Sequence, residues 1–296
     1  MKTSIIAITN QKGGVGKTAT TVNGAAAFTE IGLKVLLIDL DYQANATSYL
    51  GLKHKAKQKG RTASQALLKD LPLDRVVSTT SNPNLDVIAG DMGLSKLSRE
   101  KILDPGAAML LKQWLESNSI SKYDIILIDT HPSLDLLFQM AMTASHYYLV
   151  PMFAEADPFD GLEYMFNEIS QIKMGLNKQL FFLGLVITKF DKANATHKKF
   201  LSLLEDFCKE HKIKIRGIIP DSKAVASSSS LQKPLVWSNP KLPIAKSHIQ
   251  LARELKPEMK GVRMGRTQKT PAIVETPEHI VALFDEEPVS RNVEVF

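Results

Sequence analysis

Cysteine is nearly absent from this sequence, since Cys208 stands alone among 296 residues. One thiol can form neither an intrachain disulfide nor a cysteine cluster for zinc or iron–sulfur, so a disulfide-stapled secreted scaffold is excluded. Long apolar runs are also missing, because none approaches the roughly 20 residues that span a bilayer. The first apolar run, Thr3–Thr9, is too short for the core of a signal peptide. We therefore expect a cytoplasmic protein.

Positive charge is in modest excess, with 37 Lys and Arg against 31 Asp and Glu and a net charge of +6. The excess is unevenly distributed along the chain. Residues 275–296 hold six acidic residues and one arginine, a net of −5, so the preceding residues carry +11. A positive charge of this size, if clustered, favours an anionic partner such as nucleic acid.

Short runs rich in Ile, Val and Leu alternate with longer amphipathic stretches, which is typical of a parallel sheet covered by helices. The sequence therefore predicts an α/β fold with a doubly wound, mostly parallel sheet and helices on both faces. The expected strands are Ile5–Thr9, Val35–Asp39, Ile125–Asp129, Tyr147–Pro151, Phe182–Thr188 and Gly217–Pro220, with Leu85–Ala89 as a weaker one. The expected helices are Thr18–Glu30, Ala107–Ser117, Leu162–Met174 and His197–Lys209.

Glycines cluster directly after the first expected strand, in the segment Gln11–Thr18 that opens the first expected helix. Such glycines let successive backbone N–H groups point at phosphate oxygens, and the helix N-terminus adds its dipole. In this setting Lys17 neutralises the terminal phosphates and the Thr18 hydroxyl ligates Mg²⁺. The segment is therefore predicted to bind a nucleoside triphosphate. Its binding residues are Gly13, Gly14, Val15, Gly16, Lys17 and Thr18.

This segment departs from the general G-x4-G-K-[ST] pattern, because Gln11 replaces a glycine and Lys12 precedes the double glycine. It resembles the deviant Walker A box of the ParA/MinD family of dimeric ATPases. The resemblance implies that Lys12 is catalytic and reaches the phosphates of a partner subunit, as an arginine finger does. It further implies a P-loop fold, ATP and Mg²⁺ as cofactors, slow partner-stimulated hydrolysis, and a homodimer that forms on ATP binding.

Two acidic motifs extend the resemblance. Ile38–Thr47 is similar to the family's D-x-D-P-Q-G-N-x-T switch, and Tyr123–Leu134 is similar to its Walker B segment. The resemblance implies that Asp41 orients the attacking water, while Asp39 and Asp129 support the metal through bound water. A carboxylate at the carboxyl end of a strand is well placed for these tasks.

Other positions follow from the resemblance or depart from it. Lys189, Pro220 and Asp221 are implied to contact the nucleotide. Tyr42 and His131 each stand where the family usually has proline, and either departure could alter the hydrolysis rate. A catalytic role for His131 is the less favoured interpretation, because a lone histidine is more often structural.

Lysines follow the strand that ends at Thr188, in a region that feeds a DNA-contacting surface in many ParA proteins. Lysine meets phosphates as a point charge, without reading the bases. We therefore expect salt-sensitive, sequence-independent binding of duplex DNA by the ATP dimer. The expected contacts are Lys189, Lys192, Lys198 and Lys199, and in a second cluster Lys241, Lys246 and Arg253.

Three charged or polar segments have plainer interpretations. Lys53–Arg61 holds five positive charges and no acidic residue, and we interpret it as a solvated linker. Ser227–Ser230 is interpreted as a polar loop. Lys246, Arg253 and Lys260 are spaced seven residues apart and so lie roughly along one helical face, which we expect Pro257 to interrupt. A solvated helix face explains this second cluster as well as DNA binding does.

The resemblance runs from residue 1 to about residue 255. We therefore expect an ATPase domain over residues 1–260 and a C-terminal extension over 261–296, basic and then acidic. The phosphate loop begins at residue 11, so we expect no N-terminal helix-turn-helix domain. The sequence is thus similar to the short, Soj-type partition ATPases, whose specific DNA is read by a separate ParB-like centromere-binding partner. The predicted task is nucleoid-associated segregation of a plasmid or chromosome.

The same fold serves other tasks within the family. One alternative is a ParA-like ATPase that positions a protein cargo through an adaptor, and another is a scaffold that binds ATP and DNA but hardly hydrolyses. A MinD-like membrane ATPase is disfavoured, because acidic residues flank the last apolar segment, Ile280–Phe284, and anionic lipid would repel them. A nitrogenase-reductase-like role fails, because it needs cluster-ligating cysteines.

Overall fold

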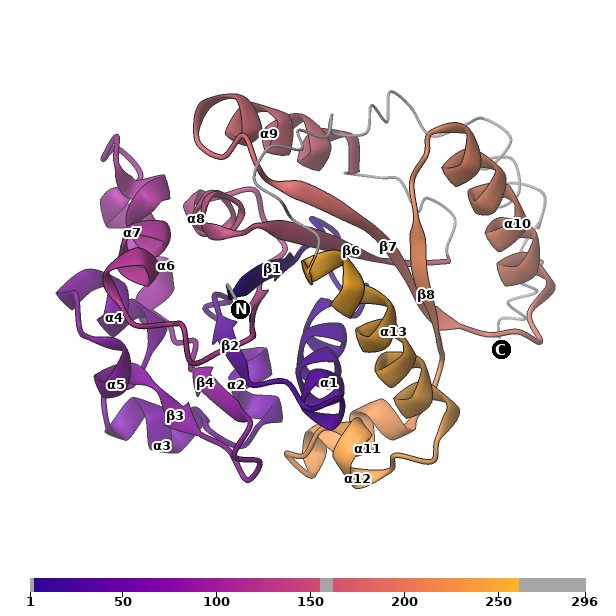
Figure 1. Ribbon diagram of the computed structural model, residues 1–296, viewed down its shortest axis with the longest axis horizontal. Coiled ribbons are helices and arrows are strands. Elements are labelled where there is room, and N and C mark those ends of the chain that lie inside the picture. Colours follow the sequence, from indigo (N-terminus) through magenta and orange to yellow (C-terminus); the bar gives the residue numbers. More distant parts are fainter. Residues whose placement is uncertain (1–2, 155–161, 261–296) are drawn as a thin grey trace, which may run out of the picture.

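The computed structural model describes residues 3–154 and 162–260. Its centre is an eight-stranded sheet in the order β3-β4-β2-β5-β1-β6-β7-β8 (Figure 1). Neighbouring strands run parallel, except that β3 pairs antiparallel with β4. The strands are β1 (Ser4–Ile8), β2 (Val35–Asp39), β3 (Ser78–Thr79), β4 (Leu85–Ile88), β5 (Ile125–Asp129), β6 (Tyr147–Phe153), β7 (Phe181–Phe190) and β8 (Ile215–Pro220).

Helices cover both faces of the sheet and enclose an apolar core on each (Figure 1). One core contains side chains of α1, α2, α12 and α13, and the other contains side chains of α4 to α10. The strands are therefore buried on both sides, which is why their sequences are nearly continuous apolar runs. The helices are α1 (Lys17–Glu30), α2 (Asn45–Tyr49), α3 (Lys53–Gln58), α4 (Ala63–Lys69), α5 (Leu73–Val76), α6 (Gly93–Lys101), a 3₁₀ turn (Ala107–Met109), α7 (Leu110–Ser117), α8 (Leu136–Ala144), α9 (Leu162–Gly175), α10 (Ala195–Glu210), α11 (Ala224–Ser230), α12 (Leu235–Ser238) and α13 (Pro243–Lys260).

The predicted fold class is confirmed. Every expected strand is present within two residues of its expected bounds, and the four expected helices are present as well. Strand β3 was not predicted, because two residues carry no periodicity. Across residues 3–154 and 162–260, no helix combines the length and the apolar character that a membrane crossing needs.

Two segments interpreted as linker or loop are helical, so those interpretations are wrong. Lys53–Gln58 forms α3, whose lysines are exposed while Ala56 is 1% exposed. Ser227–Ser230 forms the end of α11, where Ser228 is buried and hydrogen-bonds the hydroxyl of Tyr49. In each segment a buried side chain packs against the body of the protein, which the polar composition alone does not predict.

Pro257 does not interrupt the last helix, which continues to Lys260. The residue after the proline explains why. The Glu258 carboxylate accepts hydrogen bonds of 3.0 Å from both Lys214 and Arg216, at the start of β8. These contacts hold the final turn in place although the proline cannot donate a backbone hydrogen bond. The predicted extension over 261–296 lies outside the described residues.

The connections after β1 and β5 leave the carboxyl edge of the sheet toward opposite faces. Helix α1 follows β1 and belongs to one core, whereas α8 follows β5 and belongs to the other. Open α/β sheets bind ligands beyond the carboxyl ends of their strands, at the point where the connections from two neighbouring strands leave toward opposite faces. The fold therefore places the candidate site at this edge.

Candidate nucleotide-binding site

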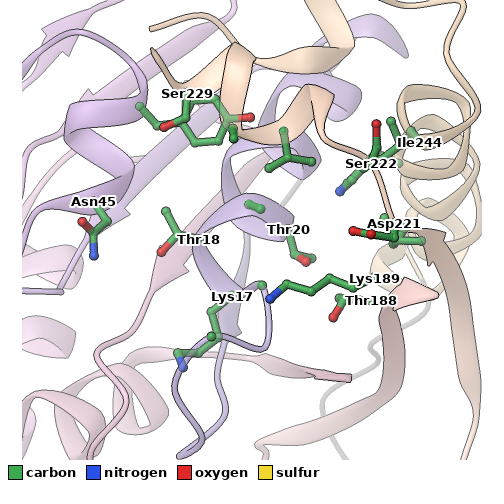
Figure 2. A pocket seen from close by; sticks show the side chains of 18 of the residues that line it. Lys17, Thr18, Thr20, Asn45, Thr188, Lys189, Asp221, Ser222, Ser229 and Ile244 are labelled. Carbon is green, nitrogen blue, oxygen red and sulfur yellow. The ribbon is translucent and has the colours of Figure 1, made fainter. Parts of the chain in front are cut away.

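A cavity of about 660 Å³ opens at the carboxyl edge of the sheet, between the loop after β1 and the segment after β8. Figure 2 shows Lys17 and Thr18 at one end, Ser222 and Ile244 at the other, and Lys189 between the two. The volume lies within the range of pockets that enclose small-molecule ligands.

The loop between β1 and α1 is curled by two glycines in the left-handed region, with φ of +75° at Gly14 and +83° at Gly16. A side chain would be strained at either position. Helix α1 begins after Gly16 without a side-chain cap, so its first N–H groups face the curl of the loop. The hydroxyl of Thr188 donates a 2.9 Å hydrogen bond to the carbonyl of Val15 and ties the loop to β7. The loop thus has the form that phosphate binding requires.

Lys17 is held inside this loop. The residue is 7% exposed, and its Nζ donates a 2.8 Å hydrogen bond to the carbonyl of Lys12. Burial lowers the pKa of Lys17 to about 8, while the nearby carboxylates of Asp129 and Asp41 oppose the shift. A desolvated ammonium gains much from an anionic ligand, so Lys17 is suited to terminal phosphates.

Asp129 ends β5 and is fully buried. The hydroxyl of Thr18 donates to its Oδ2 at 2.9 Å, and the hydroxyl of Thr21 donates to its Oδ1 at 2.8 Å. Burial raises the pKa of Asp129, the charge of Asp39 raises it further, and the two threonine hydrogen bonds oppose the rise. The carboxylate is therefore fixed in place at a point where a cation would relieve its desolvation.

Asp39 ends β2 beside it and is also fully buried. Thr47 donates to its Oδ2 from both the backbone N–H, at 2.8 Å, and the hydroxyl, at 2.6 Å. The same hydroxyl accepts a 2.8 Å hydrogen bond from the N–H of Gly90. Burial raises the pKa of Asp39, and the bonds from Thr47 oppose the rise. Helix α2 and the end of β4 thereby set the orientation of this carboxylate.

Asp41 carries the contact that the sequence did not predict. Its Oδ1 accepts a 2.8 Å hydrogen bond from the N–H of Gln43 and lies 2.9 Å from Nδ1 of His131. The ring of His131 in turn lies against that of Tyr42, with centroids 4.1 Å apart and planes inclined by 40°. The two departures from the family pattern therefore contact each other, and one of them contacts the carboxylate with the implied catalytic role.

Lys12 lies half-buried at the start of the loop. Its backbone N–H donates a 2.9 Å hydrogen bond to Oδ1 of Asn10, and Nδ2 of Asn10 donates to the carbonyl of Pro151 at 2.8 Å. Because the carbonyl of Lys12 also accepts from Lys17, contacts on both sides hold its backbone.

Apolar side chains line part of the cavity beside its charged and hydroxyl groups. Lys189, Pro220 and Asp221, which were implied to contact the nucleotide, line the same cavity as the phosphate loop, as Figure 2 shows for Lys189 and Asp221. The structure therefore brings these three residues and the phosphate loop to one cavity, which Gly13 and Val15 of the loop do not line. The cavity is also lined by Ile219, Pro220, Asp221, Ser222, Val225, Ile244 and His248.

The predicted DNA contacts other than Lys189 lie outside the cavity in two groups. One group precedes and opens α10, and the other precedes α13 and lies along it. The apolar residues of α10 and α13 belong to different cores, so these helices cover opposite faces of the sheet. The structure thus does not bring the two groups onto one face. The exposed residues are Lys192, Lys198 and Lys199 in the first group and Lys241, Lys246 and Arg253 in the second.

Sequence reasoning missed Thr21, Thr47 and His248. Thr21 lies one helical turn after Lys17, so the helical spacing carried a signal that could have found it. Thr47 ends the switch motif Ile38–Thr47, but the sequence of that motif does not predict its hydrogen bonds to Asp39. His248 lines the cavity from a helix more than 200 residues away in the sequence, so only the fold could reveal it.

The residues present fit Mg²⁺ held jointly with phosphates. In the part of the chain that the structure describes, no three His, Cys, Asp or Glu side chains converge as a self-sufficient metal cage. Mg²⁺ at nucleotide sites keeps several waters and takes few protein ligands. The hydroxyl of Thr18 offers such a ligand, and the buried pair Asp39 and Asp129 offers negative charge for the bound waters.

Comparisons with known proteins agree with this geometry. Residues 3–182 match a family model described as an AAA domain. The chain is 34% identical over 252 residues to the sporulation initiation inhibitor protein Soj of Bacillus subtilis, and the match covers 85% of this chain and 97% of Soj.

Solved structures share the fold. A plasmid partition protein from Borrelia burgdorferi B31 bound to AMPPNP superposes with a TM-score of 0.73 at 29% identity, covering 87% of this chain and all of that one. Cobyrinic acid a,c-diamide synthase from Mycobacterium smegmatis with ADP and magnesium gives 0.74 at 26% identity, covering 93% of this chain and all of that one. The chain therefore belongs to the ParA/MinD family of P-loop ATPases, on the side of the Soj/ParA partition proteins, and uses ATP and Mg²⁺.

Proposed function

We propose that this ATPase forms a homodimer when it binds ATP and in that state binds duplex DNA without sequence preference. It thereby segregates a plasmid or chromosome on the nucleoid, and a ParB-like centromere-binding protein stimulates its hydrolysis. The names of its relatives, a Soj protein and a plasmid partition protein, support this task. The observation that carries the proposal is the presence of two lysines in one phosphate loop, where Nζ of Lys17 donates a hydrogen bond to the carbonyl of Lys12.

The need for a partner subunit follows from how Lys17 is used. One buried lysine serves the terminal phosphates of its own subunit, and hydrolysis develops further negative charge on those phosphates. A second cation lowers the barrier only if it is placed at that charge. Lys12 has its backbone held from both sides, so its side chain is presented from a fixed point on the loop. In the proposed dimer it serves the phosphates of the other subunit, which ties hydrolysis to dimerisation.

The carboxylates of the site have two roles, to hold the metal and to orient the attacking water. When bound, Mg²⁺ neutralises phosphate charge, and Thr18, Asp39 and Asp129 are the residues that would hold it. Asp41 accepts hydrogen bonds through its Oδ1 from Gln43 and His131, so this oxygen is fixed. Its Oδ2 is left to orient the attacking water. His131 is in this scheme a positioning residue for Asp41.

A chain of contacts supports nucleotide-dependent DNA binding. Nζ of Lys189, which lines the cavity, lies 5.3 Å from the ring centroid of Phe153. Phe153 packs edge-on against His197 with centroids 5.8 Å apart, and Nδ1 of His197 accepts a 3.0 Å hydrogen bond from the N–H of Asp191. The exposed lysine Lys198 follows His197 directly. A rearrangement around Lys189 would therefore move the first basic group.

Two loop variants test the proposal. Lys17→Ala removes the buried phosphate cation and should abolish ATP binding. Lys12→Ala should retain ATP binding by the monomer while losing both the ATP-dependent dimer and hydrolysis. Sedimentation in ATP, nucleotide binding and phosphate release measure the three properties, and Lys96→Ala, an exposed lysine on α6, is the control. Hydrolysis at the unaltered rate in Lys12→Ala would contradict the role of Lys12 across the dimer.

A further inference from the structure

A buried histidine lines the cavity from α13, one helical turn after Ile244, which Figure 2 shows at the end of the cavity away from Lys17. His248 sits in the second turn of α13, lines the cavity and is 2% exposed. The apolar side chains of Ile219, Val225 and Ile244 line the same cavity. A polar ring in such surroundings is costly unless its nitrogen atoms are satisfied.

The tautomer of His248 follows from one contact. Nδ1 lies 2.8 Å from the carbonyl oxygen of Ile244, one turn earlier in the helix. A carbonyl oxygen only accepts, so Nδ1 carries the proton. Burial lowers the pKa of His248 to about 4, so the ring is neutral at pH 7 and Nε2 keeps its lone pair. In the described part of the chain the structure gives Nε2 no hydrogen-bond donor.

The geometry of the cavity decides which part of a nucleotide meets this lone pair. Phosphates bind at the end with Lys17 and the curled loop, so the base lies at the other end. Apolar side chains suit the faces of a purine ring, and the buried acceptor Nε2 suits one donor on its edge. Adenine carries an exocyclic amine that donates at the 6 position, whereas guanine and hypoxanthine carry an acceptor oxygen there.

We propose that His248 is a base-specificity residue, whose Nε2 accepts a hydrogen bond from the exocyclic amine of a 6-aminopurine nucleotide. The assignment rests on the proposed placement of the triphosphate in this cavity. A 6-oxo base would set its oxygen against the lone pair of Nε2 and leave both groups without a donor. A site built on a buried polar group rejects the analogue that cannot pair with it.

The test compares nucleotides that differ only at the 6 position. Equilibrium binding in Mg²⁺ is measured for ATP, for purine riboside triphosphate, which lacks the amine, and for inosine triphosphate. The wild-type protein should bind ATP about three- to tenfold more tightly than purine riboside triphosphate, the value of one neutral hydrogen bond, and should bind inosine triphosphate more weakly still. If His248 had a purely structural role, these affinity ratios would be the same in the wild-type protein and in its His248 variants.

Two variants separate the nitrogen atoms. The amide of His248→Asn reaches the position of Nδ1 and keeps the contact with Ile244, but it has no atom at Nε2, so the preference for ATP should vanish. The amide oxygen of His248→Gln reaches the position of Nε2, so part of the preference should remain. His248→Phe, which fills the ring volume without either nitrogen, repeats the first test should the asparagine variant fail to fold.

The outcomes distinguish the two proposals. Equal wild-type affinity for ATP and purine riboside triphosphate would overturn the role of His248, and so would a preference that persists in His248→Asn or His248→Phe. Either result leaves the nucleotide site itself intact, because the triphosphates still bind. If the wild-type protein binds no triphosphate, the proposed function fails and the assignment of His248 fails with it.

Discussion

Thr21 offers the sharpest quantitative test of the site, because a single hydroxyl connects α1 to the buried carboxylate of Asp129. Thr21→Val removes that hydroxyl and keeps the shape of the side chain. The 2.8 Å hydrogen bond to Oδ1 of Asp129 is lost, and a fully buried oxygen is left without its donor. Hydrogen bonds to charged groups contribute about 1.5–3 kcal/mol, so the free energy of unfolding should fall by that amount. For a domain of this size the melting temperature should fall by about 3–10 °C.

Urea unfolding of the nucleotide-free protein measures this loss, and Thr21→Ser is the matched control because it retains the hydroxyl. The serine variant should recover most of the stability, and the valine variant should also need more Mg²⁺ for ATP binding, since Asp129 is less firmly held. The carbonyl of Lys17 lies 3.0 Å from the same hydroxyl and is the competing acceptor. Equal stability of the valine and serine variants would refute the contribution of the hydrogen bond to Asp129.

The remaining predictions concern the switch segment and acid stability. A Cβ at Gly90 would lie 2.7 Å from the carbonyl oxygen of Asp41 and 2.8 Å from Cγ of Asp39, so Gly90→Ala should displace both and lower ATP hydrolysis at least tenfold. Steady-state phosphate release checks this, with Gly175→Ala, where the added Cβ meets no atom within 4 Å, as the control, and equal rates would contradict it. His248 has a pKa lowered from 6.5 to about 4 in the folded protein, so the unfolded chain binds more protons between these values. Stability should therefore fall as the pH falls from about 6.5 to 4, by up to roughly 3 kcal/mol from this residue. His248→Phe should remove that part of the acid sensitivity in urea unfolding at pH 7 and pH 4.5, and an identical pH dependence in both proteins would count against it.

The sheet could be predicted because its strands are buried on both faces. Runs such as Ile125–Asp129 need apolar side chains at every position, and that requirement is written locally in the sequence. The short helix α3 could not be predicted in the same way. Its lysines are exposed, and Ala56 is the one side chain of the helix that is buried.

The site divides along similar lines. The glycines at positions 14 and 16 were found because they cluster directly after an apolar strand, and the structure gives both the left-handed backbone that favours glycine. The contact of His131 with Asp41 and Tyr42 joins residues about 90 positions apart, so neither departure from the family pattern could be interpreted alone. His248 reaches the cavity only because α13 packs beside α1.

Retention on DNA measures whether ATP controls DNA binding by this protein. Linear duplex DNA without a centromere sequence is presented to the protein in ATP or ADP over a series of salt concentrations. We expect the DNA to retain the protein in ATP alone, and salt to release it. The slope of log affinity against log salt should become shallower by about one for each lysine removed from the first basic group. The triple variant replaces Lys192, Lys198 and Lys199 by alanine, and the control replaces Lys53, Lys55 and Lys57 of α3. Equal retention in ATP and ADP, or a loss confined to the control variant, would contradict the account.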